Sequence, residues 1–156
     1  MLPAAPKIFH GRDTELNQVL DILAQPSARV AILGAGGIGK TSLAKMLLHH
    51  PTTVERYHDN RFFVSCDAVT TDIDLASLIA SSHLGFKLAS AEKAREKVVQ
   101  HFSEGPPCLV VLDNMETAWE PLQSRGGIEE FLSLLTDVPH LALMVSSTSF
   151  RRSALS

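Results

Sequence analysis

The sequence predicts an α/β fold in which a parallel β-sheet is covered by helices on both faces. Short runs that are apolar throughout alternate along the chain with segments whose apolar residues recur at helical spacing. A continuous apolar run is typical of a strand buried on both faces, as the strands of a parallel sheet are. In addition, a glycine-rich turn joins the first apolar run to a helix, and the rest of the chain is organised around this turn.

Two strands and two helices are predicted in the first part of the chain. An amphipathic helix that ends before Pro26 precedes the first strand, at residues 30–33. The next helix starts near Lys40 and stops near Pro51, because proline cannot continue a helix. The second strand follows at residues 61–66.

Two amphipathic helices are expected after the second strand. The first begins near Asp72 or Asp74 and closes at Gly85. The second is capped by Ser90 and is terminated at Gly105. Helical segments separate each apolar run from the next, which favours right-handed crossovers between parallel strands.

The last predicted strands frame one more helix. The third strand occupies residues 108–113 and the fourth occupies residues 141–145. Between them, a turn near Gly126-Gly127 precedes an amphipathic helix. No internal repeat interrupts this order. We expect one domain, because 156 residues are about the length of a single domain.

The glycine-rich turn fits the spacing G-x-x-x-x-G-K-[ST] without a gap. A triphosphate at such a turn is wrapped by backbone N–H groups, which side chains at the glycine positions would block. The helix that follows adds the positive end of its dipole, Lys40 adds a charge for the β- and γ-phosphates, and the Thr41 hydroxyl is placed to ligate Mg²⁺. A merely tight connection would not require the Lys-Thr pair. The candidate phosphate-binding residues are Gly34, Ala35, Gly36, Gly37, Ile38, Gly39, Lys40, Thr41 and Ser42.

A carboxylate ends the third predicted strand. Asp113 follows the apolar run that starts at Cys108, and waters held by Mg²⁺ beside Thr41 need such an acceptor. The residue that activates an attacking water is left open between two candidates. Asn114 is nearer and can orient a water, whereas Glu116 can also accept its proton.

Composition excludes some classes of partner. The net charge of −3 over 156 residues offers no basic excess for nucleic acid. A secretory signal and a run of about 18 apolar residues are both missing from the sequence, so we expect no membrane contact and a cytoplasmic location. Cys66 and Cys108 lie in apolar runs, which predicts buried thiols in a reducing compartment.

Three motifs occur in this order along the chain: Phe9-His-Gly11-Arg12-x-x-Glu15-Leu16, Gly34-Ala-Gly-Gly-Ile-Gly-Lys-Thr41 and Leu109-Val-Val-Leu-Asp113. Together they resemble the nucleotide-binding domain of the STAND class, the signal-transduction ATPases with numerous domains, and in particular the NB-ARC-like proteins of filamentous fungi. The resemblance implies a P-loop NTPase sheet of order 2-3-4-1 that is followed in the family by a fifth strand. It also implies that ATP or ADP acts as a switch with slow hydrolysis, and it places Phe9, Gly11 and Arg12 on the adenine side.

The resemblance also suggests how the chain is organised. Residues 1–7 are an extended lead-in, residues 8–146 are an NB-ARC-like domain that is incomplete at its C-terminal end, and residues 147–156 are an irregular tail. We therefore expect a truncated chain without the fifth strand. The resemblance implies partners that lie outside this sequence, namely a C-terminal helical domain, a winged-helix domain and an upstream effector domain, and it is compatible with a homo-oligomer in the full-length context. Asn114 stands where the family usually has an acid, so ATPase activity is expected to be weak at most.

Two other functions fit parts of the sequence. A small P-loop phosphotransferase would need a lid rich in arginine, but only Arg151 and Arg152 come close together after Asp113. A non-enzymatic fragment could instead bind relatives through an open sheet edge.

Overall fold

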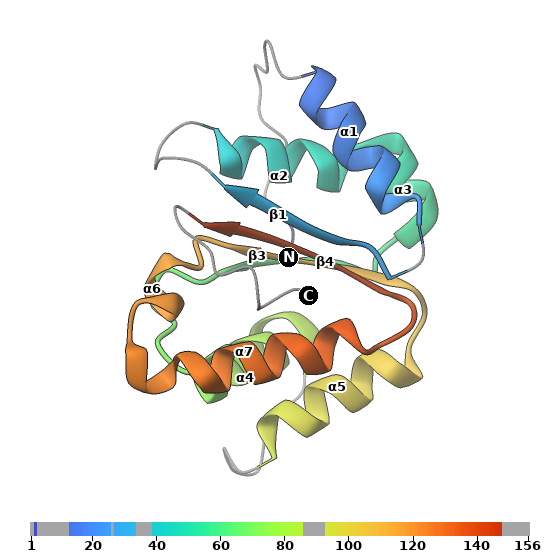
Figure 1. Ribbon diagram of the computed structural model, residues 1–156. Helices are drawn as coiled ribbons and strands as arrows, with labels where there is room; N and C mark the ends of the chain where they lie inside the picture. The colour runs from blue at the N-terminus through green and yellow to red at the C-terminus, as the bar shows by residue number, and fades with distance from the viewer. Residues whose placement is uncertain (1, 3–12, 26, 34–38, 86–92, 148–156) are drawn as a thin grey trace.

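The protein folds around a four-stranded parallel sheet (Figure 1). The computed structural model describes residue 2 and residues 13–25, 27–33, 39–85 and 93–147. In the sheet the strands have the order β1-β4-β3-β2, and each neighbouring pair is parallel. This order confirms the predicted one. The strands are β1 (Arg29–Leu33), β2 (Arg61–Ser65), β3 (Cys108–Asp113) and β4 (Leu141–Ser147).

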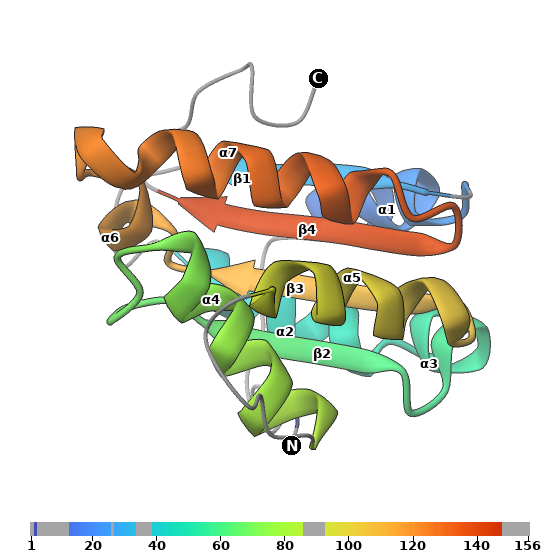
Figure 2. The same ribbon diagram turned by 90° about the horizontal axis from the view of Figure 1, so that it is seen from below.

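Helices cover both faces of the sheet (Figures 1 and 2). One face carries α1 (Asp13–Leu23), α2 (Lys40–His49) and α3 (Pro51–Tyr57). The other face carries α4 (Asp72–Leu78), its continuation η1 (Ile79–Leu84), α5 (Ala94–Glu104) and α7 (Leu122–Thr136). The short helix α6 (Glu116–Trp119) lies between β3 and α7. None of the helices in the described ranges is both long and apolar enough to cross a membrane.

The sheet separates two apolar cores, and successive residues of β3 contribute to each in turn. Leu109 and Val111 pack with α1 and α2, whereas Val110 and Leu112 pack with α4, α5 and α7. Every residue of β3 and of β4 is buried, as the unbroken apolar runs predict. Because side chains alternate along a strand, Asp113 follows Leu109 and Val111 onto the face that α2 covers.

Two short helices were not predicted. Pro51 does not simply end the preceding helix, because it is also the first residue of α3, a position at which its missing N–H is harmless. The His50 side chain caps this helix by accepting a hydrogen bond from the Thr52 N–H at 3.2 Å. Helix α6 has only four residues, which is too short for a periodic signal.

The helices on the other face depart from the predicted bounds as well. The helix from Asp72 to Gly85 changes at Ile79 from α to π geometry and ends, as expected, at a left-handed Gly85. Helix α5 begins at Ala94, after a left-handed Lys93, so the predicted Ser90 cap is wrong. Ser90 itself lies outside the described residues.

The predicted turn at Gly126-Gly127 is wrong, because both glycines lie inside α7. A Cβ atom on Gly127 would lie 2.9 Å from the Asp72 Oδ1 atom, whereas a Cβ atom on Gly126 would meet nothing within 4 Å. Asp72 is held in place by the Arg95 Nε atom at 3.3 Å. Gly127 therefore permits α7 to approach α4 closely, and its role is not to bend the chain.

Alanine substitutions at these two glycines should have different effects on stability. Gly126→Ala should stabilise the protein by about 0.5–1 kcal/mol, because alanine is the better helix former and its methyl group is exposed. Gly127→Ala should be less stable than Gly126→Ala by about 1–2 kcal/mol, because its methyl group displaces the Asp72 carboxylate. Urea unfolding of both variants measures this difference. Equal free energies of unfolding would contradict the close contact.

The two cysteines are buried, and burial raises the pKa of both thiols, that of Cys108 to about 12. A thiol in the unfolded chain ionises near a pKa of about 8.5. Its contribution to stability is therefore complete below that pH and is lost as the pH rises toward the folded-state pKa. We expect the free energy of unfolding to fall above about pH 8.5, and Cys108→Ala to reduce this slope. An unchanged slope in Cys108→Ala would contradict the prediction.

Candidate functional site

The candidate site lies at the carboxyl ends of the strands, where β3 and β4 face the first turn of α2. The strand register pairs Leu112 with Val145, so Asp113 lies level with Ser146. Thr41 comes from α2, which covers this face of the sheet. The parallel arrangement thus brings together three residues that are far apart in the sequence.

Both oxygens of the Asp113 carboxylate accept hydrogen bonds. The Thr41 hydroxyl donates to Oδ2 at 2.8 Å, and the Ser146 hydroxyl donates to Oδ1. Asp113 is 1% exposed and Ser146 is 0% exposed, so the carboxylate is held away from bulk water by two hydroxyl donors. Its main-chain carbonyl also accepts a hydrogen bond from the Cys66 N–H at 2.9 Å, which ties the strand end to the next strand.

The oxygen atoms of Thr41 and Asp113 fit a magnesium ion. A hydroxyl that donates its hydrogen keeps two lone pairs, so Thr41 can donate to Asp113 and still ligate a cation. Mg²⁺ prefers oxygen ligands and usually takes only one or two from the protein, together with waters and phosphates. Within the described ranges no group of three or more His, Cys, Asp and Glu side chains could hold a metal by itself. Thr41 and Asp113 would thus supply the oxygen ligands from the protein, and the others would come from waters or phosphates.

Lys40 contributes the positive charge of the site. It is the first residue of α2 and follows Gly39, whose φ of 88° a side chain would disfavour. Its Nζ atom lies 3.4 Å from the Glu116 Oε1 atom, and the two side chains are 5% and 21% exposed. The ammonium group thus lies at a helix N-terminus, beside a carboxylate of α6.

Asn114 adopts a left-handed conformation, with a φ of 58°. Its N–H donates to the Ser146 hydroxyl at 3.1 Å, and the N–H of Met115 donates to the Ser146 carbonyl oxygen at 3.0 Å. The turn after Asp113 is therefore tied to β4 through a single serine. Ser146 is not among the predicted site residues, although a polar residue at the end of an apolar run is a signal that could have indicated it.

The structure brings together only part of the predicted set. Lys40, Thr41 and Asp113 meet as the motif requires, Ser42 lies in the same helical turn, and Asn114 and Glu116 lie beside them. The other predicted residues lie outside the described residues, and their roles stay predictions. These are Phe9, Gly11, Arg12, Gly34, Ala35, Gly36, Gly37 and Ile38.

The carboxylates near the strand ends raise the pKa of a neighbouring thiol. Burial raises the pKa of Cys66, and the negative charges of Asp113, Asp67 and Glu116 raise it further.

Among the described residues at the site, Asp113 and Glu116 oppose the single charge of Lys40. A polyphosphate that carries a cation would balance these charges, which agrees with the oxygen ligands that the site offers.

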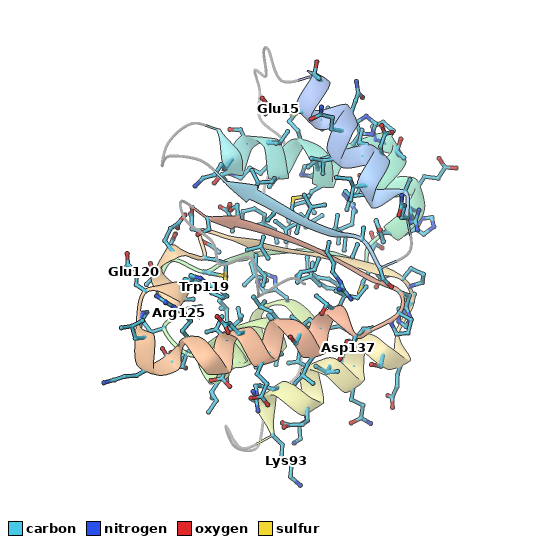
Figure 3. All side chains as sticks on the ribbon, in the orientation of Figure 1. Glu15, Lys93, Trp119, Glu120, Arg125 and Asp137 are labelled. Carbon is cyan, nitrogen blue, oxygen red and sulfur yellow. The ribbon has the colours of Figure 1, made fainter. Side chains whose placement is uncertain are left out.

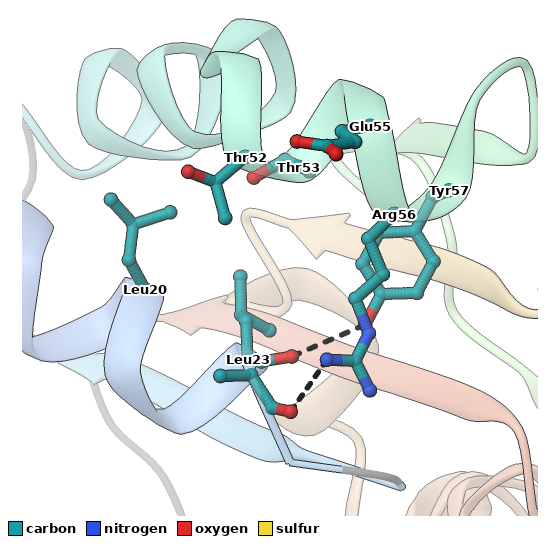
Figure 4. A pocket seen from close by; sticks show the side chains of 8 residues that line it. Leu20, Leu23, Thr52, Thr53, Glu55, Arg56 and Tyr57 are labelled. Atoms are coloured by element: carbon teal, nitrogen blue, oxygen red, sulfur yellow. Dashed lines mark hydrogen bonds between the residues drawn. The ribbon is translucent and has the colours of Figure 1, made fainter.

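A separate hollow of about 310 Å³ lies between α1 and α3 (Figure 4). Its lining includes Leu20, Leu23 and Tyr57, and burial raises the pKa of the tyrosine. The Tyr57 hydroxyl donates to the Leu23 carbonyl oxygen at 3.5 Å, and Arg56 donates to the Ala24 carbonyl oxygen at 2.5 Å. These donors hold the C-terminal end of α1 against α3. Among the described residues, the hollow shares no lining residue with the candidate site.

Comparison with solved structures shows the fold. The Orc1 protein of Aeropyrum pernix, solved in complex with DNA, matches 97% of this chain with a TM-score of 0.75 and 19% identity. Cdc6p of Pyrobaculum aerophilum matches 93% of this chain with a TM-score of 0.70 and 17% identity. This chain covers 44% and 41% of those two chains. The sheet and its helices are thus arranged as in these two proteins.

Comparison of the sequence shows the family. The disease resistance protein RGA2 of Solanum bulbocastanum is 31% identical over 139 residues, which are 85% of this chain and 12% of that protein. The chain thus spans about one eighth of the length of this curated relative. The model of the family described as novel STAND NTPase 1 matches residues 3–151. With the P-loop helix, Asp113 and the parallel sheet in place, the chain belongs to the novel STAND NTPase 1 family.

Proposed function

We propose that this chain is the ATP- and ADP-binding module of a STAND-type signalling protein, with Mg²⁺ bound between the nucleotide, Thr41 and Asp113. The observation that carries the proposal is the contact of 2.8 Å between Thr41, in the first turn of α2, and Asp113, at the end of β3. A helix N-terminus, an ammonium group and two oxygen ligands at one edge of a sheet are the parts that bind a metal polyphosphate.

In this proposal the nucleotide works as a switch. A γ-phosphate with Mg²⁺ favours one arrangement of the neighbouring domains, and its loss favours another. The relatives that support this reading are the resistance proteins, of which the chain spans a small part. We propose that an upstream effector and C-terminal helical and winged-helix domains read the switch, and that the protein acts in the cytoplasm, in some contexts as a homo-oligomer.

Hydrolysis in this site is proposed to be slow. Asn114 can orient a water but cannot accept its proton, and its side chain extends from a turn that Ser146 restrains. Glu116 can accept a proton, but its carboxylate already lies beside Lys40. Neither residue is therefore a carboxylate held directly against the attacking water. Removal of the proton from that water should then limit turnover.

Thermal unfolding with and without nucleotide tests the proposal. Mg-ATP and Mg-ADP at a hundredfold excess over Kd should stabilise the protein by about 2.7 kcal/mol, whereas Mg-GTP should not. If no nucleotide changes the melting temperature, the chain is a fragment without this function. If ATP is consumed only when a small-molecule acceptor is added, the chain is a phosphotransferase.

A further inference from the structure

We propose that Glu116 is the counter-charge of Lys40 that a bound polyphosphate must displace, so that Glu116 sets the affinity for nucleotide and does not act on water. The inference rests on the proposed nucleotide binding. Its basis is the ion pair between the Lys40 Nζ atom and the Glu116 Oε1 atom at 3.4 Å.

Lys40 needs a counter-charge because it is buried. Its side chain is 5% exposed, and a buried ammonium group is costly unless an anion compensates it. Glu116 approaches it from the first turn of α6, on the segment that follows β3. Glu116 therefore compensates the buried charge of Lys40 when no phosphate is bound.

The two carboxylates of the site differ in how firmly they are held. Asp113 is 1% exposed, and both of its oxygens accept hydrogen bonds from hydroxyl groups. Glu116 is 21% exposed, so its side chain can rotate toward solvent without opening the core. When phosphate oxygens approach Lys40, a carboxylate that stays 3.4 Å from Nζ repels them. Of the two, Glu116 is thus the one that can leave.

The main chain of α6 need not move when Glu116 leaves. The Met115 N–H is bound to the Ser146 carbonyl oxygen, and Arg125 Nε donates to the Trp119 carbonyl oxygen at 2.8 Å (Figure 3). Met115 and Trp119 are both buried. These contacts fix α6 at both ends, so the exchange of partners on Lys40 is confined to one side chain.

Glu116→Gln tests the inference, because it keeps the size of the side chain and removes its charge. Mg-ATP should bind about fivefold more tightly to Glu116→Gln, adenosine should bind unchanged, and the melting temperature without nucleotide should fall. Glu116→Asp, which shortens the side chain but keeps the charge, should lie between Gln and the wild type. Glu120→Gln removes a charge from an exposed position on the same segment and is the matched control (Figure 3). Calorimetric titration and thermal unfolding give the measurements.

In Glu116→Gln, tighter ATP binding together with a lower melting temperature distinguishes a counter-charge from a structural or a catalytic residue. If Glu116→Gln lowers the melting temperature and weakens ATP binding, Glu116 is merely structural and the inference is overturned. Unchanged affinity with lost hydrolysis would also overturn it, because Glu116 would then be the base. Failure of the proposed function gives a different result, since the folded wild type would then bind neither ATP nor ADP.

Discussion

Lys40→Ala will reduce the affinity for Mg-ATP by about 100- to 1,000-fold, with a smaller loss for Mg-ADP. Hydrogen bonds to charged groups contribute about 1.5–3 kcal/mol each, and this ammonium group can bind both the β- and the γ-phosphate. Stability without nucleotide should change little, because Glu116 is partly exposed and can be hydrated when its partner is lost. Isothermal titration calorimetry measures the affinities.

Lys45 provides the control for this substitution. It lies on the same helix and carries the same charge, but it is placed one and a half turns from the helix start and is half-buried. Lys45→Ala should bind Mg-ATP as the wild type does. An equal loss in both variants would show that the net charge of α2 matters, and it would remove the specific role of Lys40.

Asp113→Ala should have the second large effect, and it acts on both metal binding and folding. The Mg²⁺-dependent part of the ATP affinity should fall by at least about tenfold, because Thr41 alone remains as an oxygen ligand. In addition, the hydroxyls of Thr41 and Ser146 lose their acceptor, which should destabilise the protein by about 2–4 kcal/mol. Titration of ATP at several magnesium concentrations and urea unfolding measure the two effects.

Two further variants separate charge from hydrogen bonding. Asp113→Asn keeps one oxygen acceptor and should lose the magnesium effect while regaining part of the stability. Asp137→Asn neutralises an exposed carboxylate at the C-terminal end of α7 and should change neither quantity (Figure 3). If Asp113→Asn keeps the full magnesium dependence of the wild type, Asp113 does not face the metal.

The fold class could be predicted from the sequence because burial on both faces leaves an unbroken apolar run, as β3 and β4 show. The order of the strands came from the family resemblance, since periodicity says nothing about which strands are neighbours. Local signals failed where tertiary packing overrode them. Gly127 is read locally as a turn, but it lies inside α7, and a glycine stands there because Asp72 leaves no room for a side chain.

The core of the candidate site was predictable because Lys40 and Thr41 belong to one contiguous motif, and Asp113 ends a strand. Ser146 was not, because its role depends on the register that sets β4 beside β3. The same holds for the contact of Glu116 with Lys40, which joins residues 76 positions apart. Contacts between distant segments become visible only in the three-dimensional structure, whereas residues of one contiguous motif can be recognised in the sequence.

The sheet interior also determines how the site can respond to a ligand. Asp113 and Ser146 stand on the two central strands, which have helices on both sides and neighbours along both edges. Central strands are generally the part of a protein that opens least, so we expect these two side chains to keep a fixed position. The side chains that change position between a bound diphosphate and a bound triphosphate should then be those on α2 and at the start of α6.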